Sequence, residues 1–224
     1  MSIAQRLRII PTLISLLSVA WCNAVSPFTV MLAPMGDART TGRIIDKNFE
    51  RWIAWEYARE VKSRLEREIK GINVVFSRAS GEIVQPLECA NFANRLRVDV
   101  LVSINFFAET EALPRCFFYQ FSYGDEFVTL SDELAFHTYD RAHIIKRGQA
   151  TRMIERMRDL FASDSYCRQF KTSLHRMPFS PLIGMVCPAM GVEMGIKTVN
   201  GANAYVEPLV EGIKVLKREW GSVV

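Results

Sequence analysis

The sequence lacks the short cysteine pairs that mark many metal and redox sites. Its five cysteines, at positions 22, 89, 116, 167 and 187, include no CxxC pair, which excludes a zinc ribbon and a thioredoxin-type motif. A basic tail is also missing. The 28 lysines and arginines and the 24 aspartates and glutamates are scattered along the chain, so the charge predicts no nucleic-acid partner.

Long low-complexity segments and internal repeats are absent too. The chain has 224 residues, of which 49% are hydrophobic and 23% charged. That composition excludes disordered, collagenous and multi-span membrane proteins. It is the composition of one globular domain with, at most, a short appendage.

The first 24 residues have the pattern of a secretory signal peptide. Arg6 and Arg8 precede a mostly apolar run over residues 9–21, and small residues follow. We therefore expect residues 1–24 to be a signal peptide and residues 25–224 to form a single exported domain. Its expected location is the periplasm or the cell envelope.

Two alternatives stay open for an exported chain of this kind. Pro11 and the short apolar run argue against a spanning helix, which needs about 20 apolar residues, but an uncleaved segment would act as an N-terminal membrane anchor. In an oxidising compartment the remaining cysteines would be either disulfides or buried free thiols. These are Cys89, Cys116, Cys167 and Cys187.

Beyond residue 25, strand-like and helix-like patterns alternate. Short apolar runs predict strands over 28–33, 73–77, 100–105 and 116–122, and a last one within 184–194. Helical periodicity predicts helices over 48–70, 86–97, 132–170 and 206–220. This alternation predicts an α/β three-layer sandwich, a mostly parallel twisted sheet with helices on both faces. A helical insert is expected around residues 131–147.

Five local strings occur in an order that resembles one enzyme family. They are 32–38 (LAPMGDA), 46–49 (DKNF), 74–78 (VVFSR), 92–105 (FANRLRVDVLVSIN) and 188–196 (PAMGVEMGI). Together they resemble the zinc-dependent N-acetylmuramoyl-L-alanine amidases, exported enzymes that cut the amide between muramic acid and the peptide stem of the bacterial cell wall. The resemblance covers nearly all of residues 28–220. It implies the amidase fold, and peptidoglycan, a muropeptide or an envelope protein as partner.

The resemblance also shows which catalytic groups are altered. The family holds a zinc ion with two histidines and a glutamate, and a second glutamate serves as the base. By position, Gly36 and Asn105 replace the two histidines, Asp46 replaces the glutamate ligand, and Glu193 keeps the base. Glycine has no donor atom, and an amide oxygen is a poor zinc ligand. We therefore predict no zinc cofactor and a non-catalytic protein.

The predicted binding cleft is lined by Gly36, Asp37, Asp46, Arg78, Asn105 and Glu193. One alternative is an active amidase with a rebuilt metal site, since Asp37, Asp46 and Asn105 offer oxygen atoms that suit Mg²⁺ or Ca²⁺. Another is a structural module of an envelope machine. Without a ligand, Glu193 would be a paired or solvated carboxylate, and Asn105 would cap a turn.

Two further expectations concern the second half of the chain. Some family members carry a helical segment that blocks the site, and residues 131–145 occupy a similar place. We therefore expect that deleting this segment changes ligand binding. His137, His143 and His175 lie outside the matched strings and are expected at the surface.

Overall fold

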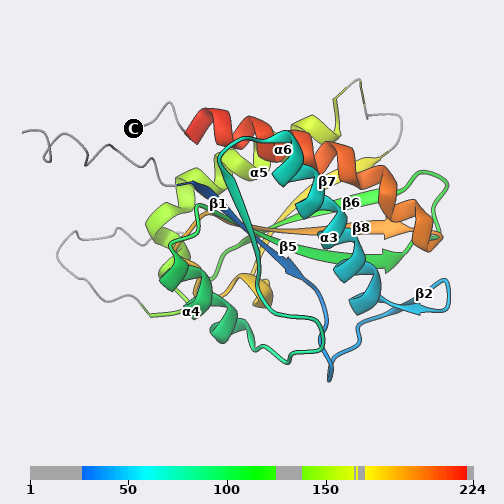
Figure 1. Cartoon of the computed structure of the whole chain (residues 1–224), viewed down its shortest axis with the longest axis horizontal. Helices are drawn as coiled ribbons and strands as arrows, with labels where there is room; N and C mark the ends of the chain where they lie inside the picture. The colour runs from blue at the N-terminus through cyan, green and yellow to red at the C-terminus, as the bar shows by residue number, and fades with distance from the viewer. Residues whose placement is uncertain (1–26, 125–137, 164, 166–169, 221–224) are drawn as a thin grey trace, which may run out of the picture.

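The computed structural model describes residues 27–124, 138–163, 165 and 170–220 (Figure 1). A six-stranded sheet has the strand order β4-β1-β5-β8-β6-β7. In chain order the strands are β1 Phe28–Pro34, β4 Ile72–Phe76, β5 Val100–Ala108, β6 Arg115–Phe121, β7 Lys171–Met177 and β8 Ala189–Ile196. Neighbours from β4 to β8 run parallel, β6 is antiparallel to β8, and β7 is parallel to β6. The sheet is therefore mostly parallel, as predicted.

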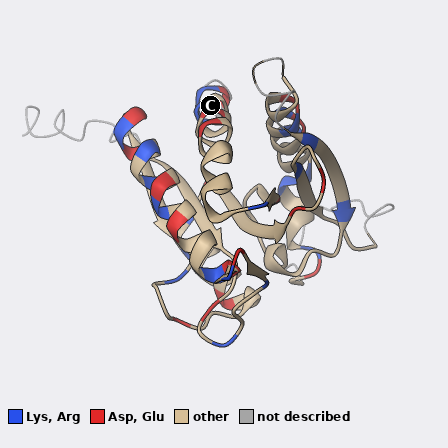
Figure 2. Ribbon diagram, turned by 90° about the vertical axis from the view of Figure 1, so that its right-hand side faces the viewer, with Lys and Arg blue, Asp and Glu red and all other residues tan. Residues whose placement is uncertain are grey.

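Helices cover both faces of this sheet. They are α3 Glu50–Glu68, α4 Pro86–Leu96, α5 Arg147–Phe161 and α6 Val206–Trp220. Figure 2 shows α3, α6 and α5 side by side, and they share one hydrophobic cluster with one face of the sheet. Helix α4 packs on the other face in a smaller cluster. This confirms the α/β three-layer sandwich.

The sequence explains where α3 and α4 form. Helix α3 buries Ile53, Tyr57, Val61 and Leu65, which recur every four residues, while acidic and basic residues alternate along the rest of its ribbon (Figure 2). Helix α4 starts with a proline in its first turn and a capping box. The burial of one apolar stripe on each helix therefore fixes how it packs on the sheet.

Two predicted helix boundaries were wrong. The expected helix over 48–70 begins only at Glu50, because a two-stranded hairpin of β2 Ile44–Ile45 and β3 Asn48–Phe49 precedes it. The expected helix over 132–170 comprises a 3₁₀ turn, η1 Ala142–Lys146, followed by α5, and the chain then enters β7. Residues 131–137 of the expected insert lie outside the described residues.

The structure describes three of the four cysteines beyond residue 24 and none of residues 1–24. Residues 1–24 lie outside the described part of the chain, and within that part no helix is both long and apolar enough to cross a bilayer. Cys89, Cys116 and Cys187 are buried free thiols, and Cys167 lies outside the described residues. Burial raises the pKa of Cys89 to about 11 and that of Cys187 to about 12, so both stay protonated and unreactive near neutral pH.

A buried carboxylate fixes the connection from β5 to β6. Glu109 accepts hydrogen bonds from the backbone N–H groups of Thr110, Glu111 and Arg115 and pairs with the Arg115 guanidinium at 3.0 Å. Burial raises the pKa of Glu109, but these donors outweigh it and lower the pKa to about 2. Its folded-state pKa is therefore below its ordinary value, so it stabilises the fold above about pH 4.5 and progressively less toward pH 2.

We predict that Glu109→Gln lowers the free energy of unfolding at pH 7 by about 2 kcal/mol, because the charge-assisted bonds to Arg115 and the loop are weakened. Part of the wild-type loss of stability between pH 4.5 and 2 should disappear in the same variant. Urea unfolding across this pH range measures both. Glu111→Gln, at a neighbouring exposed position, is the control, and equal behaviour of the two variants would contradict the assignment.

Candidate functional site

The carboxyl ends of β1, β5 and β8 bring several predicted residues to one edge of the sheet. Side chains alternate along a strand, so Ser103 and Asn105 face the α4 side, opposite the buried Val102. Asn105 is paired in register with Glu193 on β8, and Tyr119 on β6 is paired with Gly191. Ser103, Asn105, Glu193 and Tyr119 therefore share one face, at the edge where open α/β sheets bind ligands.

Both oxygens of Glu193 are occupied by donors from this chain. The Arg43 guanidinium donates to Oε1 at 2.5 Å, and the Tyr119 hydroxyl donates to Oε2 at 2.6 Å. Burial, together with the hydrogen bond to Glu193, raises the pKa of Tyr119, so its hydroxyl remains a donor. Glu193 is 13% exposed. It is therefore a paired carboxylate, one of the two roles expected for it without a ligand.

A second carboxylate lies on the other side of the same arginine. Glu50, the buried first residue of α3, accepts from Phe106 N at 2.8 Å and from Arg43 N at 3.1 Å. Arg43 also donates to the Phe106 carbonyl at 2.9 Å. Burial lowers the pKa of Arg43, but Glu193 and Glu50 raise it by more. Arg43 therefore contacts both acids, Glu193 through its guanidinium and Glu50 through its backbone N–H.

Arg43 and Glu50 are not among the site residues predicted from the sequence. Asp46 was assigned to the position of the zinc-binding glutamate, but it lies in the turn of the β2–β3 hairpin with φ 48°. There it is exposed and accepts a hydrogen bond from Val199 N at 3.3 Å. Glu50, four residues further on, is the acid whose carboxylate reaches β5. Glu50 is the first residue of a helix with a clear apolar period, and this position is the sequence signal that could have identified it.

Three of the other predicted residues line one hollow of about 270 Å³, which we call the edge hollow. Gly36 and Asp37 follow β1, Arg78 follows β4, and Ser103 lies on the floor strand β5. Asn105 is buried next to Ser103 and donates to its hydroxyl at 3.2 Å and to the Val192 carbonyl at 3.3 Å. The edge hollow thus brings together Gly36, Asp37 and Arg78, whereas Asn105, Glu193 and Asp46 are not among its lining residues.

These residues do not fit a zinc ion. Gly36 offers no donor, the Asn105 amide nitrogen is directed at two oxygens of its own sheet, and Asp46 lies in the hairpin turn. The carboxylates of Glu50 and Glu193 are already engaged by N–H and O–H donors. Among the described residues no three His, Cys, Asp or Glu side chains are grouped so as to hold a metal ion.

The backbone at Gly36 adds a steric obstacle. Its φ is +77°, and a Cβ placed there would lie 2.6 Å from the Cβ of Arg51 and 2.9 Å from the Thr40 carbonyl oxygen. A side chain of any kind is therefore strained at this position. A Gly36→His substitution alone would therefore not fit here without a shift of the surrounding backbone.

The described part of the expected insert lies away from the edge hollow. Tyr139 hydrogen-bonds Asn91 on α4 and accepts from Gly184 N, and none of residues 138–145 lines the hollow. The described part of the insert therefore does not line this site, and residues 131–137, which include His137, lie outside the described residues. His143 is half-buried, with its ring 4.8 Å from that of Phe121, rather than at the surface. His175 is exposed, as expected.

The fold is similar to that of solved N-acetylmuramoyl-L-alanine amidases. The amidase Ami1 from Mycobacterium smegmatis has a TM-score of 0.62 at 16% identity, covering 86% of this chain and 97% of that one. An amidase from Clostridium difficile 630 gives 0.61 at 17%, covering 85% and 96%. The CwlD amidase from Clostridioides difficile, solved in complex with the GerS lipoprotein, gives 0.58 at 10%, covering 88% and 99%.

Comparisons of sequence find no matching family model and no matching curated protein. The amidase likeness therefore lies in the fold, at low sequence identity. The chain is an α/β protein with the architecture of the peptidoglycan amidases.

We predict that Gly36→Ala lowers the free energy of unfolding by about 2–4 kcal/mol, because it combines backbone strain with overlap at Arg51. Gly81→Ala is the matched control: Gly81 has φ +83° with nothing within 4 Å of an added Cβ, so the strain alone costs about 1–2 kcal/mol. Chemical denaturation of both variants measures the difference. An equal loss in the two would show that position 36 has room for a side chain.

Proposed function

We propose that this chain is an exported, non-catalytic protein of the bacterial envelope that binds peptidoglycan or a muropeptide through its amidase-like edge hollow. The observation that carries the proposal is Arg43, whose guanidinium pairs with Glu193 at 2.5 Å and whose backbone N–H donates to Glu50 at 3.1 Å. The fold, similar to that of peptidoglycan amidases, supports the class of ligand. The signal-peptide pattern of residues 1–24 supports export.

The chemistry of this ion pair argues against hydrolysis. Amide cleavage near neutral pH needs an activated water, and a metal ion provides it by lowering the pKa of a bound water. A guanidinium has no open coordination position. A general base must also have a free oxygen that can accept a proton in the reaction, whereas both oxygens of Glu193 already accept hydrogen bonds, from Arg43 and Tyr119. The groups at this edge stabilise one another and leave no free base.

The edge hollow has the composition of a binding site. Its volume of about 270 Å³ suits a single sugar or amino-acid residue, close to the lower limit for ligand pockets. Ala33, Pro34, Val84 and Pro181 provide apolar walls. The polar side chains that line it are those of Asp37, Thr40, Ser77, Arg78, Gln85, Ser103 and Ser180. An acetylated, amide-rich molecule such as a muropeptide offers matching apolar and hydrogen-bonding groups.

A second candidate is an envelope protein as the partner. The outward face of α4 exposes Leu87, Phe92 and Leu96, each between 38% and 45%. Exposed apolar side chains gathered on one helix are typical of a protein contact. One structural neighbour was solved with a lipoprotein partner. Loss of partner capture in a Phe92→Ser variant, with wall binding unchanged, would favour this second function.

Cosedimentation of the full chain with insoluble peptidoglycan tests the first proposal. We expect the protein in the pellet, with no release of peptide stems over the time in which an active amidase releases them. Binding that competes with soluble muropeptides supports the edge hollow as the site. Stem release by the purified chain would falsify the non-catalytic assignment, and absence from the pellet would refute wall binding.

Blocking the rim should abolish this binding. Thr40 is exposed and lines the edge hollow, whereas its neighbour Arg39 is exposed and does not. We predict that Thr40→Trp reduces the pelleted fraction severalfold, because the indole fills the opening, and that Arg39→Trp has little effect. Both variants should keep the wild-type melting temperature. If Thr40→Trp still pellets like the wild type, the ligand binds elsewhere.

A further inference from the structure

Arg78 is a half-buried cation whose hydrogen-bonding capacity is largely unused. Its guanidinium lies 5.3 Å from the ring centroid of Trp55 and makes only long contacts to backbone carbonyls, 3.3 Å to Ala79 and 3.5 Å to Pro34. Its Nε is buried without a partner. In the described part of the chain no carboxylate forms an ion pair with it. Buried polar atoms are normally satisfied, so this one points to a missing acceptor.

Arg78 also connects the edge hollow to a larger groove. This second cavity, of about 630 Å³, begins at Asp37 and Arg78 and runs past Trp55 and Trp52 to the β2–β3 hairpin. We call it the tryptophan groove. Its size is in the range of sites for small organic ligands. A ligand in the edge hollow can therefore extend into the tryptophan groove past Arg78.

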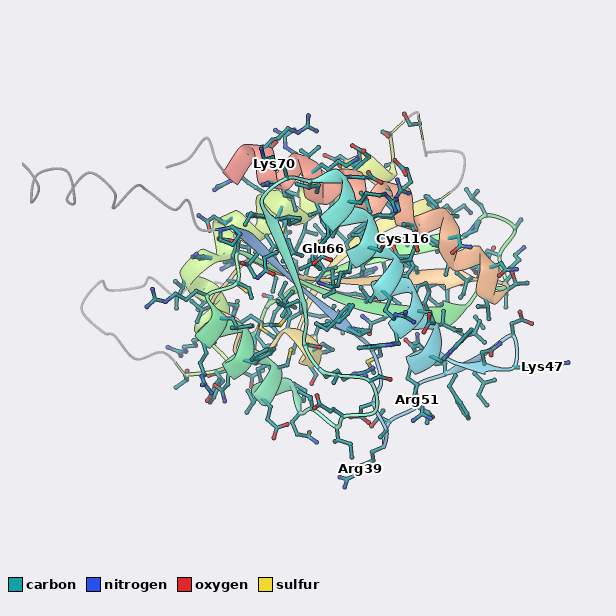
Figure 3. The ribbon with its side chains drawn as sticks, viewed as in Figure 1. Arg39, Lys47, Arg51, Glu66, Lys70 and Cys116 are labelled. Atoms are coloured by element: carbon teal, nitrogen blue, oxygen red, sulfur yellow. The ribbon has the colours of Figure 1, made fainter. Side chains whose placement is uncertain are left out.

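The charge of the tryptophan groove favours an anion. Lys47, Arg51 and Arg78 line it, and Asp37 is the one acid among its lining residues. Asp37 is engaged, because its carboxylate accepts from Arg39 N and Thr40 N. Figure 3 shows Arg51 and Lys47 at the same end of the molecule, at the start of α3 and on the hairpin. Of the three cations, Arg78 is the one with an unsatisfied buried nitrogen.

The aromatic wall favours a sugar ring beside that anion. Trp52 is 48% exposed although it is large and apolar, and Trp55 lies between Arg78 and the ring of Phe76. Indole faces next to polar groups, here Asn48 and Ser80, offer an apolar surface together with hydrogen-bonding partners at the edges. A saccharide ring presents the same combination.

We propose that the tryptophan groove binds a saccharide that carries a carboxylate, with the sugar ring against Trp52 and the carboxylate on the Arg78 guanidinium. A guanidinium binds a carboxylate through two parallel hydrogen bonds, and this pairing supplies the acceptor that Nε lacks. The proposal rests on the proposed function and deepens it, because it names the anionic group of the wall ligand. That group is either the lactyl carboxylate of muramic acid, free once its peptide is removed, or a carboxylate of the stem.

The test uses N-acetylmuramic acid and its carboxamide, which share a ring and a shape and differ in charge. Calorimetric titration of the full chain should show tighter binding of the acid, and Arg78→Gln should weaken it about tenfold while leaving the carboxamide unchanged. Arg78→Lys should keep part of the preference. Arg39→Gln, an exposed arginine outside the groove, is the control for overall charge. Trp52→Ala should weaken both sugars.

The outcomes separate this inference from the proposed function. Equal affinity of wild type and Arg78→Gln for N-acetylmuramic acid, with both proteins folded by melting temperature, overturns the role of Arg78. If N-acetylmuramic acid binds through Arg78 but the chain does not pellet with peptidoglycan, the result supports the carboxylate subsite and refutes the proposed binding to the cell wall. Comparing glycan strands before and after enzymatic removal of the stems identifies the carboxylate: tighter binding afterwards assigns the lactyl group, and weaker binding assigns the stem.

Discussion

The ion pair between Arg43 and Glu193 determines what the carboxyl edge of this sheet can do. It joins the segment before the β2–β3 hairpin to strand β8, and through Glu50 it also ties the start of α3 to β5. The Arg43 guanidinium, whose side chain is 54% exposed, pairs with Glu193, while Glu50 accepts hydrogen bonds from two backbone N–H groups. The guanidinium donates to two acceptors, the Phe106 carbonyl and Glu193 Oε1. Neither Arg43 nor Glu193 lines the edge hollow or the tryptophan groove.

Much of the fold was predictable from the sequence. Strands β1 and β5 are buried along nearly their whole length, so each reads as a continuous apolar run in the sequence. Helix α3 is buried on one side only, so its apolar residues recur every four positions. Strand β7 was missed because its side chains are polar or half-exposed at the sheet edge. The sequence of β7 therefore lacks the alternation of apolar and polar residues that predicts a strand. The reversal of β6 against β8 likewise leaves no mark in single-strand patterns.

The site was predictable only in part, for a local reason. Motif order placed Gly36, Arg78, Asn105 and Glu193 at one edge, because strand ends converge there. It failed at Asp46, since the turn of the β2–β3 hairpin has two positive φ angles at Asp46 and Lys47 without the glycine that usually signals such a turn. Arg43 carries no motif at all, and its role depends on a tertiary contact 150 residues away along the chain.

We propose that an arginine, and not a metal ion, holds this edge of the sheet. Titration of the full chain with Zn²⁺, followed by calorimetry, tests it most directly. We expect no stoichiometric binding, and the same result in a Glu193→Gln variant. One zinc ion bound per chain, with affinity lost in Glu193→Gln, would contradict this proposal and would indicate a metal site of the kind that metal-dependent hydrolases have.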